Sequence, residues 1–172
     1  LRQIQIDLIL MLHMQFENPS QVASGLHLLS GDAGRIIAFA NGKTEFSLGK
    51  RSIYRSTPLI EGGPFGVVAA VKVRDGAFSL GGWDFYENLP LSAEFSETKA
   101  YWKREAMGIR LEKSLSYFPG LNTDSCTEKT VYTVKNMGEN PVEVSFCVYF
   151  EPVMIPRADF ESHPAFARLM LE

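Results

Sequence analysis

Apolar and polar residues alternate along most of this 172-residue chain, and a period of two predicts β-strands. The clearest run covers residues 142–151. Successive side chains of a strand point to opposite faces, so one face of this strand is predicted to lie against a core. Residues 130–135 are its predicted partner, and the loop 136–141 joins the two as a hairpin. The apolar positions of the run are Val142, Val144, Phe146, Val148 and Phe150.

Two tight hairpins are predicted earlier in the chain, at an Asn-Gly and an Asp-Gly dipeptide. Both dipeptides tolerate the positive φ angles that the central positions of a type I′ turn require. The first hairpin joins residues 35–40 to 43–48 through Asn41-Gly42, and the second joins residues 67–74 to 77–80 through Asp75-Gly76.

Three further strands are predicted at residues 91–95, 100–104 and 109–118. In the last of these the alternation slips at residues 112–114, and a β-bulge there is the interpretation that explains the slip. Trp102 lies within a predicted strand and is expected to be a core residue.

The two ends of the chain are less regular. Residues 4–16 keep strict alternation and favour a strand, although a helix remains an alternative. Residues 164–170 alone have helical spacing, with Pro164 suited to a first helical turn. The chain begins at Leu1 rather than Met and stops inside an apolar-periodic segment, so we expect a piece of a longer polypeptide.

About nine to eleven short strands, separated by regular turn signals, are typical of a sandwich of two antiparallel sheets. The predicted fold class is therefore all-β, an antiparallel β-sandwich with a short helical segment near the C-terminus. Residues 1–172 are predicted to form a single domain, with residues 1–20 as an extra N-terminal strand or a linker.

Composition narrows the function classes. Hydrophobic residues make up 45% of the chain, including 12 Phe, which is enough for a sizeable core. The net charge is −3 and no basic face stands out, so nucleic acid is not an expected partner. No 18-residue apolar run is present, and no membrane segment is predicted.

The cysteines and histidines of the chain do not indicate a disulfide framework or a metal site. Cys126 and Cys147 are predicted to be reduced thiols, which favours a cytoplasmic location. Neither they nor the histidines have the spacing of zinc ligands, so neither a metal nor a cofactor is predicted.

A series of short motifs in the second half of the chain is similar to a known family. The series consists of Ala100-Tyr-Trp-Lys-Arg104, Gly108-Ile109, residues 128–136, 138–145 and 148–151, and the closing His163-Pro-Ala-Phe166. In this order, residues 95–172 resemble the N-terminal β-sandwich domain of the glycoside hydrolase family 94 group. That group holds cellobiose, chitobiose and β-1,2-oligoglucan phosphorylases and the phosphorylase-like region of cyclic β-1,2-glucan synthases. The first half of the chain departs from the family pattern, which leaves the glycosidic linkage open.

The resemblance implies a galactose-mutarotase-like supersandwich that braces an (α/α)6 catalytic barrel of the same parent chain. The barrel would hold the catalytic groups, so this chain by itself is expected to be non-catalytic. The parent protein would be a glycoside phosphorylase or a glycosyltransferase that acts on β-glucans, and the sandwich would take part in homodimer contacts.

The loop 81–88 is the candidate for contact with a β-glucan oligosaccharide. Trp and Tyr rings stack on the apolar face of a sugar, and nearby carboxylates accept hydrogen bonds from its hydroxyl groups. The alternative is that the aromatic residues fold back and close one end of the sandwich. The predicted carbohydrate-binding residues are Trp83, Asp84, Tyr86 and Glu87.

The His-Pro-Ala-Phe motif is interpreted as a structural corner formed by His163, Pro164 and Phe166. A histidine before proline suits a turn held by backbone hydrogen bonds better than an acid–base role. Paired carboxylates are the usual machinery of glycoside cleavage, and three acidic pairs close in sequence are available. All three are expected to be solvated surface charges: Asp84 with Glu87, Glu94 with Glu97, and Asp159 with Glu161.

Two other functions stay open. A freestanding carbohydrate-binding module would need an exposed aromatic platform. A pure protein-interaction domain would need a large exposed apolar face.

Overall fold

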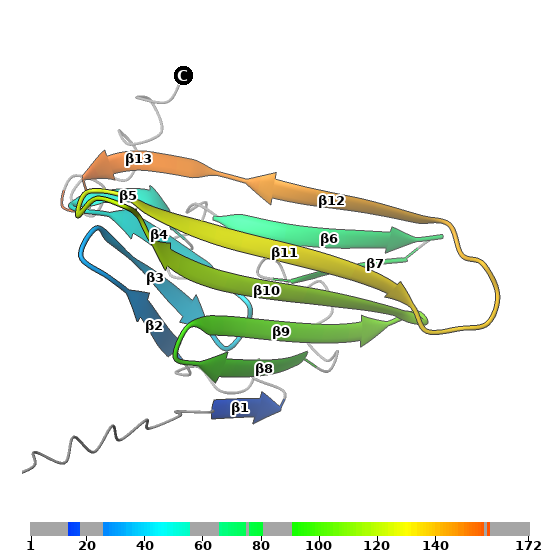
Figure 1. The fold of residues 1–172 in the computed structure, drawn as a ribbon. Helices are drawn as coiled ribbons and strands as arrows, with labels where there is room; N and C mark the ends of the chain where they lie inside the picture. The colour runs from blue at the N-terminus through cyan, green and yellow to red at the C-terminus, as the bar shows by residue number, and fades with distance from the viewer. Residues whose placement is uncertain are drawn as a thin grey trace, which may run out of the picture.

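The computed structural model describes residues 14–17, 26–55, 66–74, 76–80, 91–156 and 158. Within these residues the chain forms thirteen β-strands in three antiparallel sheets (Figure 1). The all-β class expected from the alternation is confirmed. The proposed helical segment after His163 and residues 1–13 lie outside the described residues.

Sheet 1 has five strands in the order β1-β8-β9-β10-β11. They are β1 (Met14–Glu17), β8 (Leu91–Ser96), β9 (Lys99–Ala106), β10 (Ile109–Pro119) and β11 (Cys126–Asn136). The last four strands are consecutive in the chain and pair as a meander. Strand β1 confirms the extended conformation predicted for the end of the N-terminal segment, since Met14 pairs with Phe95.

Sheets 2 and 3 form the opposite layer. Sheet 2 has the order β13-β5-β4-β3-β2, with β2 (Leu26–Ser30), β3 (Gly34–Phe39), β4 (Thr44–Leu48), β5 (Arg51–Tyr54) and β13 (Pro152–Pro156). Sheet 3 has the order β12-β6-β7, with β6 (Val67–Val73), β7 (Gly76–Leu80) and β12 (Val144–Phe150).

Sheets 2 and 3 are joined at their edge. Strands β12 and β13 follow one another along the same edge of the sandwich (Figure 1), and Glu151 between them donates its backbone N–H to the carbonyl of Gly66 at 2.9 Å. Gly66 in turn lies against Arg55, because a Cβ added at Gly66 would be 3.0 Å from the Arg55 carbonyl oxygen. Arg55 and Gly66 therefore lie side by side, and the successive edge strands β12 and β13 pair with β6 and β5.

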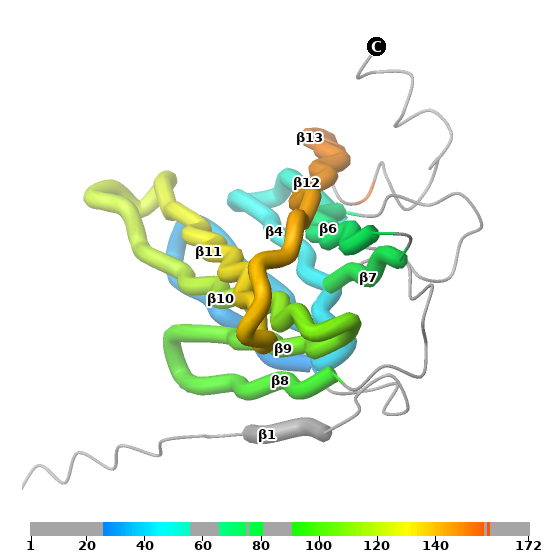
Figure 2. The backbone as a smooth tube through the Cα atoms, turned by 90° about the vertical axis from the view of Figure 1, so that its right-hand side faces the viewer, coloured from blue at the N-terminus to red at the C-terminus, as the bar shows by residue number. Residues whose placement is uncertain are grey.

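One core fills the space between the layers (Figure 2). It combines inward side chains of both layers, among them Ile36 and Phe78 on one side and Phe95, Trp102 and Leu111 on the other. Trp102 is wholly buried, as predicted, and its indole N–H donates to the Phe39 carbonyl of the opposite layer at 2.9 Å.

The strand pairing of both tight hairpins is confirmed, but the predicted type I′ turns are wrong, because Asn41 has no positive φ and Gly76 already belongs to β7. Strands β3 and β4 pair around Asn41-Gly42, where Gly42 has a φ of 90°. Strands β6 and β7 pair with Val73 opposite Gly76, and the positive φ in this turn falls on Arg74 at 52°.

The predicted hairpin between residues 130–135 and 142–150 is wrong. Strand β11 pairs with β10, and β12 pairs with β6 in the other layer. The connection after β11 carries the chain across the sandwich, so the two strands meet only through side chains. An example is the contact of Tyr132 with Phe146, whose ring centroids lie 5.8 Å apart.

The prediction of a bulge in β10 is also wrong. From Ile109 to Ser116, β10 pairs without a register shift with both β9 and β11. The inward phase runs through Ile109, Leu111, Lys113 and Leu115, which are all buried. The apparent slip in the sequence is a lysine that occupies a core position.

Strand β12 is not half-buried as predicted. Every residue from Val144 to Phe150 is exposed. The reason is topological: β12 is an edge strand of sheet 3, and β11 ends sheet 1 on the same side, so neither face of β12 is fully covered.

Candidate functional site

The residues predicted to bind carbohydrate, Trp83, Asp84, Tyr86 and Glu87, lie in segment 81–90, outside the described residues. The corner residues His163, Pro164 and Phe166 also lie outside them. Both assignments therefore stay predictions.

Of the three acidic pairs, the structure describes Glu94 and Glu97. Glu94 is half-buried on the side of β8 that points away from the core, and Glu97 is exposed in the turn after this strand. Cys126 and Cys147 are both free thiols. Among the described residues no group of three His, Cys, Asp or Glu side chains is arranged to hold a metal ion.

A chain of polar side chains crosses the interior between sheets 1 and 2, and we call it the polar relay. It consists of Lys113 on β10, Thr44 on β4, Tyr54 on β5 and Glu128 on β11. The Lys113 ammonium group donates to the Gly42 carbonyl and to Thr44 Oγ1, both at 3.2 Å. Its third side faces the ring of Trp102, with Nζ 4.9 Å from the ring centroid. The ammonium is thus surrounded by two hydrogen-bond acceptors and one aromatic ring.

The proton count fixes the direction of the remaining bonds. Tyr54 Oη lies 2.6 Å from Glu128 Oε2, a distance typical of a phenol that donates to a carboxylate. The phenol has one proton, so the 3.3 Å contact between Tyr54 Oη and Thr44 Oγ1 uses the threonine proton. Ammonium, hydroxyl, phenol and carboxylate therefore form one directed chain.

Burial sets the electrostatics of the relay. It lowers the pKa of Lys113 from 10.5 to about 8, although the Glu128 carboxylate acts in the opposite direction. Burial and the same carboxylate raise the pKa of Tyr54 well above its usual value. Lys113 has no exposed surface, and its hydrogen bonds tie the two layers together.

An apolar surface lies along β12, and we call it the β12 strip. Its side chains point to the same side of the strand as the core, and yet 37–50% of their surface is exposed. The inner contacts are ring contacts: Phe146 with Tyr132, and Phe150 with Tyr54, each with centroids 5.8 Å apart. The strip consists of Val144, Phe146, Val148 and Phe150.

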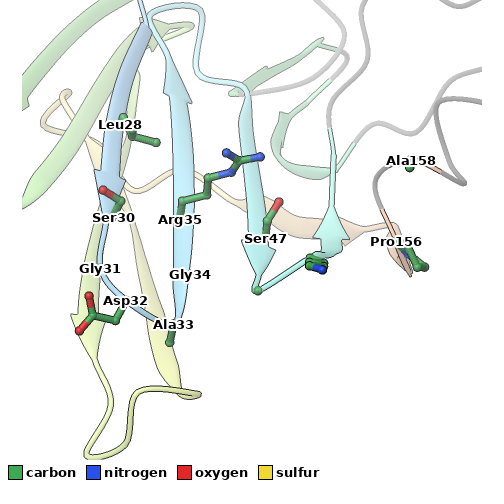
Figure 3. A pocket seen from close by; sticks show the side chains of 12 residues that line it. Leu28, Ser30, Gly31, Asp32, Ala33, Gly34, Arg35, Ser47, Pro156 and Ala158 are labelled. Carbon is green, nitrogen blue, oxygen red and sulfur yellow. The ribbon is translucent and has the colours of Figure 1, made fainter.

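A cavity of about 740 Å³ opens on the outer face of sheet 2, and we call it the outer cavity (Figure 3). Strand pairing places Ser30 opposite Arg35 and Arg35 opposite Ser47, so three adjacent strands contribute one polar row. Figure 3 shows Arg35 between the two serines. Leu28 forms an apolar part of the lining, and Lys50 adds a second positive charge.

Sequence reasoning missed both the relay and the outer cavity. For Lys113 the sequence did hold a signal: it alternates in step with the apolar residues Ile109, Leu111 and Leu115, which places it on the inward face of the strand. The sequence held no local signal for the polar row, because a two-residue turn at Asn41-Gly42 would set Arg35 against Leu48, whereas the turn over residues 40–42 sets it against Ser47.

No protein-family model matches this sequence, and no curated protein matches it. Among the described residues no helix is long and apolar enough to cross a membrane.

Proposed function

We propose that this chain is a non-catalytic β-sandwich module of a carbohydrate-active enzyme and that it braces an (α/α)6 barrel of the same parent polypeptide. The proposal rests on the ordered motif series that resembles the family 94 sandwich. The observation that carries the bracing role is the exposed β12 strip. A glycoside phosphorylase or glycosyltransferase for β-glucans is the proposed parent, in the cytoplasm, where both free thiols stay reduced.

The strip favours a packing role for a physical reason. Covering apolar surface stabilises a contact by roughly 25 cal/mol per Å² removed from water. Contiguous exposed apolar surface on a small domain is typical of a surface that another module covers. Val144, Phe146, Val148 and Phe150 form such a surface without an interposed charge on that face. A helix laid along the strip would bury all four side chains together.

The catalytic part of the proposal is tested on the purified chain. It is incubated with nitrophenyl β-glucosides, and with cellobiose-type and β-1,2-linked oligosaccharides plus inorganic phosphate. We expect no release of nitrophenol and no sugar phosphate. Turnover above a heat-inactivated control would overturn the non-catalytic assignment.

The bracing part is tested on the parent polypeptide. The coding DNA after codon 172 is expected to specify a largely helical region of several hundred residues. In that longer protein, Phe146→Ser should loosen the contact and increase protease cleavage between the two modules. Val131→Ser is the matched control, because Val131 is equally exposed but lies on the outer side of β11. Equal cleavage of the two variants would contradict docking on the β12 strip.

A further inference from the structure

The outer cavity holds cationic groups that have no counter-ion in the described part of the chain. No hydrogen bond or ion pair there engages the Arg35 guanidinium, and none engages Lys50. Among the described residues of the lining, Asp32 is the one acidic residue, and it lies in the turn after β2, apart from Arg35 (Figure 3). The described part of the lining therefore has two positive charges against one negative charge.

The polar row gives these charges a defined geometry. Directly opposite residues on antiparallel strands have Cβ atoms about 4.5–5.5 Å apart. The Arg35 side chain is therefore flanked by the Ser30 hydroxyl on β2 and the Ser47 hydroxyl on β4. A guanidinium is a planar fork of donors that matches the two oxygens of a carboxylate or a phosphate. Serine hydroxyls on both sides can donate to further oxygens of the same ligand.

The rest of the lining leaves room and adds an apolar face. Four lining residues next to the row are small: Gly31, Ala33, Gly34 and Gly49. At Gly49 the cavity is open, since no atom lies within 4 Å of a Cβ added there. Leu28 lies one row from Ser30 on the same face of β2 and is half exposed. Such a side chain suits the apolar C–H face of a sugar ring.

We infer that the outer cavity binds a saccharide carrying one phosphate or carboxylate group, with the anion on the Ser30–Arg35–Ser47 row and the ring against Leu28. This site is separate from the β12 strip and does not depend on the proposed bracing role. It also does not use the predicted sugar-binding loop at residues 81–88.

The site is tested by isothermal titration calorimetry on the whole chain with four probes. Glucose 1-phosphate and glucuronate separate the two anion types, inorganic phosphate tests the anion alone, and glucose tests the ring alone. We expect one-site binding of at least one anionic sugar, weaker binding of inorganic phosphate and no binding of glucose. Added NaCl should weaken the binding, because the attraction is between charges near the surface.

Three variants locate the binding. Arg35→Gln should lower the affinity by about tenfold or more, since it removes the charge-assisted hydrogen bonds. Arg35→Lys keeps the positive charge but loses the planar guanidinium, so its affinity should lie between those of the original chain and Arg35→Gln. Arg74→Gln is the control, because Arg74 is an exposed arginine that lines a different cavity, at the β6–β7 end. All variants should keep the thermal midpoint of the original chain. In two-dimensional NMR, the amide signals of Gly31, Gly34 and Gly49 should shift on titration.

Several results would overturn the inference. One is the absence of binding by both anionic sugars at millimolar concentration. Another is an affinity that survives Arg35→Gln or is lost equally with Arg74→Gln. Inorganic phosphate binding as tightly as the sugar phosphate would remove the saccharide part of the assignment. None of these results bears on the bracing proposal, which turnover and module docking test independently.

Discussion

Polar side chains are buried in the interior around Lys113, whereas apolar side chains are exposed along the edge strand β12. Between sheets 1 and 2, an ammonium group and a phenol are buried, and each has hydrogen-bond partners. Along β12, four apolar side chains remain 37–50% exposed although they point toward the core side. The comparison shows that position in the sheet order decides burial in this protein. Strand β10 is covered on both sides by neighbouring strands and faces the opposite layer, whereas β12 ends its sheet.

The largest difference between the two regions should appear when an aromatic residue is truncated in each. Trp102→Ala removes a wholly buried indole and its hydrogen bond to Phe39, and it should lower the free energy of unfolding by about 3–5 kcal/mol. Phe146→Ala, at the exposed edge, should cost about 1 kcal/mol or less. Urea unfolding followed by circular dichroism measures both. Similar losses for the two variants would mean that β12 is covered in solution.

The buried ammonium should make stability depend on pH. Below pH 8 both the folded and the unfolded chain hold the Lys113 proton, and the folded state bears the full cost of a buried charge. Between its folded pKa of about 8 and its ordinary value of 10.5, the unfolded chain holds more protons, so stability rises with pH. The gain is at most roughly 3–4 kcal/mol, because one pKa unit corresponds to about 1.4 kcal/mol. Above about pH 10, the raised pKa of Tyr101, about 12, and that of Tyr54 act in the opposite direction.

The measurement is a series of urea unfolding curves from pH 7 to pH 11 on the original chain and on Lys113→Met. The original chain should be most stable between pH 9 and pH 10. Lys113→Met should lose the rise between pH 8 and pH 10. An unchanged pH profile in this variant would show that Lys113 is not the group responsible.

Removing one tyrosine hydroxyl in each region compares the buried relay with the exposed strand β12 more closely. Tyr54→Phe leaves Glu128 Oε2 and Thr44 without their shared partner inside the sandwich, and it should cost about 1–3 kcal/mol. Tyr149→Phe is the matched change on β12, where the hydroxyl lies 3.5 Å from Glu151 at the surface, and it should cost less than about 0.5 kcal/mol. Thermal unfolding at pH 7 distinguishes the two. Equal shifts of the midpoint would argue against a cooperative relay.

The smallest expected effect on stability comes from changing the β12 strip itself. The double variant Phe146→Ser/Val148→Ser should change the free energy of unfolding by about 1 kcal/mol or less but should markedly reduce the fluorescence of a dye that binds exposed apolar surface. Val131→Ser on β11 should leave most of the dye signal. If the double variant keeps the dye signal, the strip is not the main accessible apolar surface.

Local patterns predicted most of the strands but not their neighbours. The Asn41-Gly42 hairpin was predictable because the turn dipeptide and the alternation on both sides agree within a few residues. The pairing of β12 with β6 was not, because the partners are far apart in the chain and the connection after β11 crosses between layers. Lys113 was interpreted as a slip because a charged residue is rarely placed in a core, and its partners at Gly42 and Thr44 come from another sheet.

The candidate sites also differ in whether the sequence could indicate them. The sugar-binding prediction for the loop with Trp83 and Tyr86 rests on residue type alone, and it stays a prediction. The polar row of the outer cavity contains ordinary residues, Ser30, Arg35 and Ser47, that no motif singles out. Only the register of three neighbouring strands brings them together.

By itself, the sequence determined that this protein is all-β, where most of its strands begin and end, and which face of most strands is apolar. These properties follow from the two-residue period and from turn chemistry, which act over a few residues. The tertiary structure decided which strands lie at an edge, which apolar face stays open to solvent and which charged group is buried. Those outcomes depend on hydrogen bonds and contacts between segments distant in the chain, and no local pattern contains them.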